Sequence, residues 1–471
     1  MKSELLTSEE IKAGESATIA EGKSAEFLME RAAQGVVDVI LKEFSPCPTL
    51  VFCGPGKNGG DAQVVARLLK KQGWLVQVVK LSEVPSLKEI ESLVNQASLI
   101  VDGLFGTGLS RPLEEDVLKL VKLINASGKP IVAIDIPTGI DTNSGVCWGE
   151  AIRAHSTVTF WRARPGHFLL PGRIYVGKLF VKDIGIADQH LPMMAYHLNT
   201  PHLWKECLKG PLPSDHKYTR GACLIIGTGC MPGAVRLASL SARRVGAALV
   251  RLICKVEEYP IFAAVAWGDV VTPIASAEEF LGWIIDERFK ALLWGAGAFP
   301  HQSTREQALV LLSSKKPCVL DGGALSSFEG KTGELTNHLH KNVILTPHEG
   351  EFHRLFPHLA FLKSKVEKAL KAALEGGAVV VLKGHDTVIA SPEGKVCINA
   401  NAPATLATAG TGDVLAGLMS GLLAQGVPPF EAAAAAVWIH GEAANRMGIG
   451  LIAEDLPGQI PHVLQLMEII N

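Results

Sequence analysis

The stretch that decides the fold class runs Thr49-Leu-Val-Phe-Cys-Gly-Pro-Gly-Lys-Asn-Gly-Gly-Asp61 and continues as Ala62-Gln-Val-Val-Ala-Arg-Leu-Leu-Lys-Lys71. Residues 49–53 are apolar or β-branched and predict a buried strand. After a glycine-rich turn, Val64, Val65, Leu68 and Leu69 recur on one face of a helix. A strand, a tight turn and an amphipathic helix in this order form the repeating unit of parallel sheets covered by helices.

The same alternation continues along the chain and indicates an α/β protein. Further strands are expected at Leu75–Val79, Leu99–Asp102, Ile131–Asp135, Cys223–Ile226, Leu249–Ile253, Leu292–Trp294, Cys318–Leu320, Val343–Leu345 and Val379–Leu382. Two helices, Gly412–Gln425 and Phe430–Met447, close the series. The polar stretch Lys205–Arg220 contains proline and glycine and predicts a linker. We therefore expect two domains, 1–205 and 206–471.

Composition narrows the possible classes of protein. The 471 residues are 48% hydrophobic, which excludes a disordered chain and a small disulfide scaffold. Lys and Arg number 45 against 47 Asp and Glu, so nothing favours a nucleic acid or an anionic membrane as partner. The start of the chain has no signal-peptide pattern, and no apolar run reaches the ~18–20 residues of a membrane span. Nine cysteines without a CxxC pair favour free thiols in a reducing cytoplasm.

Three predicted strands of the first domain are followed by glycine-rich or acidic turns. These are Gly54–Asp61, Asp102–Pro112 and Asp135–Asp141. Ligands of open parallel sheets bind at the carboxyl ends of strands, so one shared site is a better interpretation than three structural turns. Asn58, Asp102 and Thr138 offer only oxygen ligands, which suit a hard cation.

The second domain carries Ala407-Thr-Ala-Gly-Thr-Gly-Asp413 directly before an apolar helix. Successive N–H groups at a helix start predict an anion hole. Asp413 could accept a proton from a substrate hydroxyl. An Asp in a first helical turn is also a favourable helix-start charge, but that alternative does not explain the preceding Gly-Thr-Gly.

The first domain contains the motifs GPGKNGGD, DGLFGTGLSRP and DIPTGID in this order, together with Phe27–Ala33, Thr157–His167 and Val181–Ile186. These segments resemble the epimerase domain of the NAD(P)H-hydrate repair family, which implies a Rossmann-like three-layer fold. Family members interconvert R- and S-NAD(P)HX. The resemblance implies K⁺ at Asn58, Asp102 and Thr138, and Asp135 is the acid/base candidate. Substrate contacts are implied at Lys57, Asn58, Gly59, Gly60, Asp61, Gly106, Thr107, Gly108, Leu109, Ser110, Arg111, Pro112 and Asp135.

Four positions depart from that family's usual residues. Lys57 and Ala62 flank the Asn-Gly-Gly-Asp core where Asn and Gly are usual, Thr138 replaces a Ser, and Arg164 replaces a Lys.

The second domain resembles the ribokinase-like three-layer fold, whose GTGD loop serves phosphoryl transfer. The motifs Lys217–Gly221, Pro232–Ala238, Val245–Val250, Thr346–Glu351 and Leu382–Thr387 resemble the nucleotide-dependent NAD(P)H-hydrate dehydratase branch. The resemblance implies contacts with the hydrate from Ala234, Gly297, His348 and the catalytic Asp413. It implies contacts with the nucleotide from Lys383, Gly384, His385, Asp386, Thr387 and Gly412. Here the departures are Ala298-Phe299 where Leu-Gly is usual, Gly322-Gly323 where Ala-Asp is usual, and Pro403 where Asn is usual.

The two resemblances imply a bifunctional enzyme that epimerises NADHX and NADPHX and dehydrates the S epimer with ADP or ATP and Mg²⁺. The fused chain resembles ADP-dependent members, although no single residue decides between ADP and ATP. A homo-oligomer is possible. The alternative is a ribokinase-class kinase for a small molecule, joined to a non-catalytic binding or scaffold domain.

Overall fold

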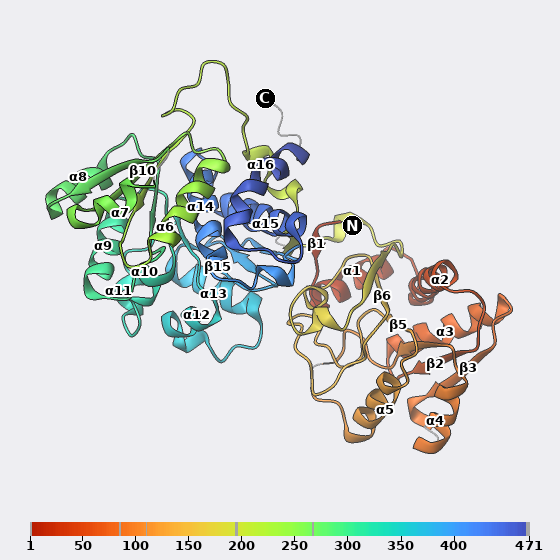
Figure 1. Cartoon of the computed structure of the whole chain (residues 1–471). Coiled ribbons are helices and arrows are strands. Elements are labelled where there is room, and N and C mark those ends of the chain that lie inside the picture. The colour runs from red at the N-terminus through yellow and green to blue at the C-terminus, as the bar shows by residue number, and fades with distance from the viewer. Residues whose placement is uncertain (1, 84–85, 110, 194–195, 266–267, 468–471) are drawn as a thin grey trace. The chain divides into compact units, whose positions relative to one another are not determined.

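The computed structural model describes residues 2–83, 86–109, 111–193, 196–265 and 268–467. The chain divides into two compact units, 1–197 and 198–471, coloured red to yellow and green to blue in Figure 1. Within the described ranges, no helix is long and apolar enough to cross a membrane. All nine cysteines are free, as expected.

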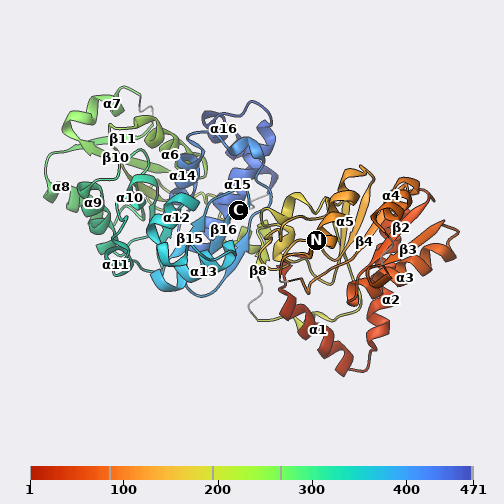
Figure 2. The ribbon, with the colours of Figure 1, turned by 90° about the horizontal axis from the view of Figure 1, so that it is seen from below.

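The first unit is a parallel sheet with helices on both faces, as predicted. Its strand order is β3-β2-β4-β5-β6-β7, and every neighbouring pair is parallel. The strands are β2 (Thr49–Cys53), β3 (Val76–Lys80), β4 (Leu99–Gly103), β5 (Ile131–Ile134), β6 (Ser156–Phe160) and β7 (Lys178–Lys182). Strand residues face the two sides in alternation. One apolar cluster joins them to α2 (Ala25–Glu43) and α3 (Lys57–Lys71), and another to α4 (Leu87–Gln96) and α5 (Glu115–Ala126) (Figure 2).

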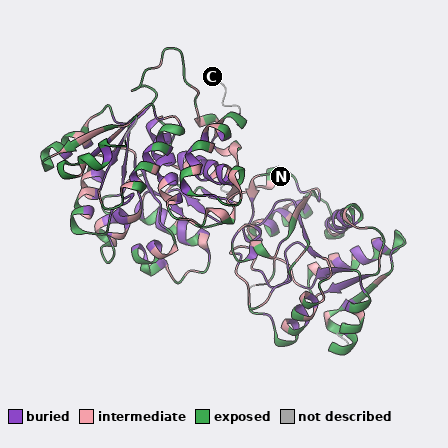
Figure 3. Ribbon diagram, viewed as in Figure 1, coloured by how far each residue is buried: buried purple, intermediate pink, exposed green. Residues whose placement is uncertain are grey.

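The second unit has the sheet order β17-β16-β15-β14-β13-β12-β9-β10-β11. Its strands are β9 (Ala222–Ile226), β10 (Leu249–Lys255), β11 (Val270–Ile274), β12 (Ala291–Trp294), β13 (Cys318–Leu320), β14 (Val343–Leu345), β15 (Val379–Leu382), β16 (Val388–Ala390) and β17 (Val396–Ile398). Among the described residues of this unit, β16 pairs antiparallel with both β15 and β17. A large apolar core lies between the sheet and α6 (Pro232–Arg244), α14 (Thr411–Ala424), α15 (Pro429–Met447) and α16 (Leu456–Leu466), and Figure 3 shows these strands as mostly buried.

Further helices pack on this sheet outside that core, among them α9 (Gln302–Ser313) and α13 (Lys365–Gly376). Shorter helices are α7 (Tyr259–Ala263), α8 (Ala277–Ile285), α10 (Gly322–Ser326), α11 (Thr332–Thr336) and α12 (Glu349–Leu355). In the first unit, α1 (Ser8–Ala20) precedes α2, and the short β1 (Glu4–Leu5) pairs with β8 (Tyr196–Leu198).

The structure differs from the sequence prediction at several boundaries. Strand β5 ends at Ile134, because Asp135 adopts a left-handed backbone with φ 66° that cannot continue a strand. The two units divide at 197/198 rather than 205/206. The reason is that Trp204 is buried in the core of the second unit, where its indole N–H donates to Asn199 Oδ1. Strands β6, β7, β11, β16 and β17 were not expected. Strands β6 and β7 contain polar or charged residues, β11 contains a proline, and β16 and β17 have three residues each.

Candidate active sites

The glycine-rich loop after β2 and the loop after β4 lie against each other. A Cβ on Gly54 would stand 1.6 Å from the Leu104 carbonyl oxygen, and one on Gly59 would stand 1.9 Å from the Gly54 carbonyl oxygen. Only glycine permits such approaches. Helix α3 begins here, and its N-cap Gly56 makes no side-chain cap bond, so N–H groups of the first turn remain available to an anion.

The three proposed cation ligands come together. The buried Asp102 accepts hydrogen bonds from Thr138, with Oδ1 2.7 Å from Oγ1 and Oδ2 2.8 Å from the backbone N. Asn58 lies beside the loop that follows Asp102, where a Cβ on Gly106 would stand 3.3 Å from Asn58 Oδ1. The Asn58 Nδ2 atom is buried without a partner. Burial raises the pKa of Asp102 to about 6, and hydrogen bonds from Thr138 and Leu104 only partly offset it.

Asp135 is held rigidly at the end of β5. Its Oδ1 accepts from Arg164 Nη2 and from Thr159 Oγ1, each at 2.9 Å. His167 fixes the backbone: its Nδ1 accepts the Arg164 N–H, which leaves Nε2 to donate to the Asp135 carbonyl oxygen. Burial and the Arg164 charge lower the pKa of His167 to about 4, so the ring is neutral. These contacts compensate for the left-handed φ, and strained residues of this kind concentrate at functional sites.

Asp61 differs in protonation from an ordinary carboxyl group. Burial, followed by the charges of Asp135 and Glu15, raises the pKa of Asp61 to about 8. At neutral pH Asp61 therefore retains its proton. By contrast Lys57 is largely exposed and pairs with Glu15 at 2.9 Å.

The remaining predicted residues of this site lie around the same loops. Gly60 sits close to Met29, and the Thr107 carbonyl accepts from Ser8 Oγ. Leu109 is half-buried, whereas Gly108, Arg111 and Pro112 are exposed. Ser110 lies outside the described residues.

In the second unit, α14 begins at Thr411 with Gly410 as its N-cap in a left-handed conformation, φ 88°. Asp413 lies in the first turn, and burial, followed by the charge of Asp321, raises its pKa to about 6. Lys383 follows β15, and its ammonium group lies close to this turn. A Cβ built on Gly412 would stand 3.6 Å from Lys383 Nζ. The start of α14 therefore combines N–H groups, a carboxylate and an ammonium.

A cavity of about 340 Å³ opens beside this helix start. Predicted residues on its wall are His348, Lys383, Gly384, His385, Thr387 and Gly412. Asp386 is not on the wall; it is buried and pairs with Lys365 at 2.6 Å. Sequence reasoning missed the wall residues Asn399, Leu406, Leu415, Val437 and His440. Val437 and His440 belong to α15, whose apolar composition indicated only a core helix.

Ala234 and Gly297 are neighbours outside that cavity wall. A Cβ on Gly297 would lie 3.2 Å from Ala234 Cβ. Nearby, two departures from the family's usual residues meet, since a Cβ on Gly323 would stand 2.0 Å from the Ala298 carbonyl oxygen. The altered loop at Ala298 thus occupies the space of a side chain at 323.

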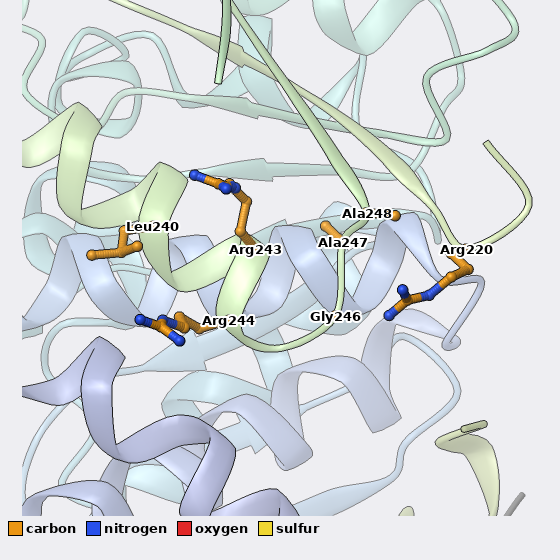
Figure 4. A pocket seen from close by; sticks show the side chains of 7 residues that line it. All are labelled: Arg220, Leu240, Arg243, Arg244, Gly246, Ala247 and Ala248. Atoms are coloured by element: carbon orange, nitrogen blue, oxygen red, sulfur yellow. The ribbon is translucent and has the colours of Figure 1, made fainter. Parts of the chain in front are cut away.

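Another cavity, of about 500 Å³, is lined by Arg220, Leu240, Arg243, Arg244 and residues 246–248 (Figure 4). It lies where α6 ends and where β9 and β10 begin, away from the carboxyl ends of the strands that carry the site. It contains no predicted site residue. Arg243 and Arg244 occupy the last turn of α6, where basic side chains interact favourably with the helix dipole.

The two units define a class of protein. A Rossmann-like domain, with buried carboxyl groups at Asp102 and Asp135, is fused to a ribokinase-like domain in which a helix begins with N–H groups, a carboxylate and an ammonium. Family profiles agree with this division. The family described as NAD(P)H-hydrate dehydratase matches residues 222–460, and that described as YjeF-related protein N-terminus matches 25–93 and 79–166.

Full-length relatives identify the family. A bifunctional NAD(P)H-hydrate repair enzyme from Gloeobacter violaceus is 34% identical over 94% of both chains, and one from Moorella thermoacetica is 32% identical over 94% of this chain and 92% of its own. This chain therefore belongs to the family of bifunctional NAD(P)H-hydrate repair enzymes. The match extends through both domains and supports that assignment over a kinase with a non-catalytic partner domain.

Solved structures agree for the second unit. The ADP/ATP-dependent NAD(P)H-hydrate dehydratase from Bacillus subtilis, co-crystallised with ATP and Mg²⁺, has a TM-score of 0.50 and 28% identity over 57% of this chain and 98% of that chain. A ribokinase-like superfamily protein from Enterococcus faecalis has a TM-score of 0.53 at 22% identity, over 57% of this chain and 96% of that one, and shows the fold alone.

Proposed function

We propose that this chain epimerises R- and S-NAD(P)HX in its first unit and dehydrates S-NAD(P)HX in its second. The observation that supports dehydration best is Asp413 in the first turn of α14, beside Lys383 and a cavity walled by predicted nucleotide-binding residues.

In dehydration, Asp413 takes the proton of the C6 hydroxyl, and the oxygen attacks the terminal phosphorus of ADP or ATP. The bond from that phosphorus to the bridging oxygen breaks, and AMP or ADP leaves. The N–H groups at the start of α14 and the ammonium of Lys383 stabilise the phosphoryl group in transit. The C6–O bond then breaks, driven by the ring nitrogen's lone pair, and phosphate leaves. Loss of a proton from C5 forms the ring double bond and restores NAD(P)H.

Epimerisation needs an acid and a base near C6 of the nicotinamide ring. Asp61, which keeps its proton at neutral pH, supplies the acid, and the Asp135 carboxylate supplies the base. Arg164 and Thr159 both bind Oδ1 of Asp135, which leaves Oδ2 for the substrate. The helix start at Gly56 would bind phosphate of the dinucleotide.

The site of Asn58, Asp102 and Thr138 suits K⁺. Its donors are oxygen atoms, the Asn58 amide nitrogen has no acceptor, and no cationic side chain contributes to the pKa of Asp102. A bound cation would stabilise the ionised carboxylate and the adjoining loops. Among the described residues, no cluster of three His, Cys, Asp or Glu side chains forms another metal site. Mg²⁺ would enter with the nucleotide and neutralise its phosphates.

The deciding experiment supplies the purified chain with S-NADHX and ADP or ATP and follows the absorbance of NADH. A repair enzyme yields NADH together with free phosphate. A kinase of the ribokinase class would instead accumulate a stable phosphate ester. The same preparation compares ADP with ATP as the phosphoryl donor and gives the oligomeric state, for which we predict a homo-oligomer. We also predict a cytoplasmic location.

A further inference from the structure

Asp321 makes contacts that its own helix does not require. It follows β13 and occupies the N-cap position of α10, yet its carboxylate makes no capping bond to that helix. Its Oδ1 instead accepts from Lys383 Nζ at 2.9 Å and from Thr346 Oγ1 at 2.6 Å. The side chain is 6% exposed, against 19% for Lys383. Asp321, Thr346 and Lys383 directly follow β13, β14 and β15, so this carboxylate oxygen links the ends of three neighbouring strands.

A stabilising ion pair is a poor explanation for this contact. Removing two charges from water offsets most of their attraction, so a buried pair contributes little net stability. Asp321 and Asp413 are instead two carboxylates that act on one ammonium. The pKa of Lys383 is lowered by burial, but the charges of Asp321, Glu351 and Asp413 outweigh this and leave it raised. Lys383 in turn lowers the pKa of Asp413, against burial and Asp321, which raise it.

We propose that Asp321 is a positioning residue of the phosphoryl-transfer site: its carboxylate ties the Lys383 ammonium to the end of β13 and prevents it from pairing with Asp413. The Asp413 carboxylate is then free to take the hydroxyl proton, and Lys383 directs its other N–H donors toward phosphate. This inference rests on the proposed role of Asp413 as the base.

Other charged groups near Lys383 do not replace Asp321. Glu351 of α12 is buried and its carboxylate accepts the His348 backbone N–H at 2.9 Å. His440 of α15 is also buried, and burial lowers its pKa to about 4, so it is neutral where Asp413 titrates. The charges that act on the Asp413 carboxyl group are those of Asp321 and Lys383.

The test is the pH dependence of kcat/KM for S-NADHX in the full chain, with Asp321→Asn against the wild type. The amide keeps size and an acceptor but loses the charge, so Lys383 shifts toward Asp413 and makes it a weaker base. We expect the acid limb to move down by at least one pH unit and the rate at neutral pH to fall about tenfold. An acid limb that stays in place would overturn the proposal.

Thr346→Val is the matched control. It removes the other hydrogen bond to the same oxygen but keeps the charge of Asp321 and the volume of the side chain. The acid limb should stay in place; a shift as large as that of Asp321→Asn would show that general disturbance of the strand ends, not the hold on Lys383, is responsible, and would overturn the proposal.

A second comparison asks whether Asp321 acts through Lys383. In a Lys383→Met background, Asp321→Asn should move the acid limb by less than half as much as it does in the wild type. Equal shifts in both backgrounds would overturn the proposal, because Asp321 would then act on Asp413 through its own charge alone. If Asp321→Asn alone does not fold, the double variant against Lys383→Met still decides: a shift of one pH unit or more between these two would overturn the proposal, and a shift of less than half a unit is expected. Activity retained by Asp413→Asn would instead refute the proposed base.

Discussion

Replacing Asp135 by Asn should stop epimerisation and leave dehydration of pure S-NADHX unchanged. Asn keeps an oxygen that can accept from Arg164 and Thr159, which now bind Asp135 Oδ1 at 2.9 Å each. It also tolerates the left-handed φ of 66° better than most residues. The variant loses the negative charge and the ability to take a proton, but it keeps an acceptor for both donors. Because general base catalysis contributes about 10²–10⁴-fold, conversion of R-NADHX should fall by that factor.

The choice of Asn over Ala follows from the surroundings. The Arg164 side chain is 2% exposed, and Ala would leave its buried charge with neither a carboxylate nor any side-chain acceptor at position 135, at a cost of about 3–5 kcal/mol. An Ala at this φ would add about 1–2 kcal/mol of backbone strain. Together these approach the ~5–15 kcal/mol by which whole proteins are stable, so Asp135→Ala could lose activity by unfolding.

The assay starts from R-NADHX with ADP in excess and follows NADH formation, which requires epimerisation first. Asp38→Asn, the same substitution at an exposed position of α2, is the control and should match the wild type. If Asp135→Asn converts R-NADHX as fast as the wild type, the assignment of the base is wrong. If the wild type itself does not exceed the spontaneous rate, the first unit is not an epimerase.

Four further outcomes are expected. Asp413→Asn should abolish dehydration but bind nucleotide with nearly unchanged affinity by calorimetry, since an amide cannot take the hydroxyl proton. In the wild type, the pKa of about 6 for Asp413 means that the active carboxylate is lost on acidification, so kcat/KM for S-NADHX should fall about tenfold from pH 7 to pH 5; a flat profile would contradict this. Asp102→Ala should weaken hydrate binding by the first unit and remove the anomalous-diffraction peak that a potassium-substitute salt gives between Asn58 and Thr138; a peak that persists would refute the ligand set. Trp204→Ala should destabilise the second unit by about 3–5 kcal/mol in denaturant unfolding, whereas unchanged stability would place Trp204 outside its core.

Local patterns in the sequence were sufficient for the fold class and for the position of both candidate sites. Each strand of the first half that the sequence predicted exists within a residue or two, because a buried parallel strand is a continuous apolar run. The loops were found because glycine permits close backbone approaches, as between Gly59 and Gly54 within one turn. That Gly54 also lies against Leu104 of the loop after β4 could not be predicted from the turn itself. Strand β6, Ser-Thr-Val-Thr-Phe, was missed because its polar residues are buried only through tertiary packing.

By itself, the sequence determined the fold class and the candidate site residues: the carboxyl groups, the glycine-rich turns and the helix start at Thr411 can be recognised from neighbours in the chain. Only the tertiary structure decided the surroundings of those groups. Arg164 reaches Asp135 from the loop after β6, Lys383 reaches Asp321 from two strands away, and Trp204 joins the core of the second unit. Protonation followed from the same source, since Asp61 and Asp413 owe their raised pKa values chiefly to burial. Burial and long-range charge are properties of the packed chain, so no local pattern records them.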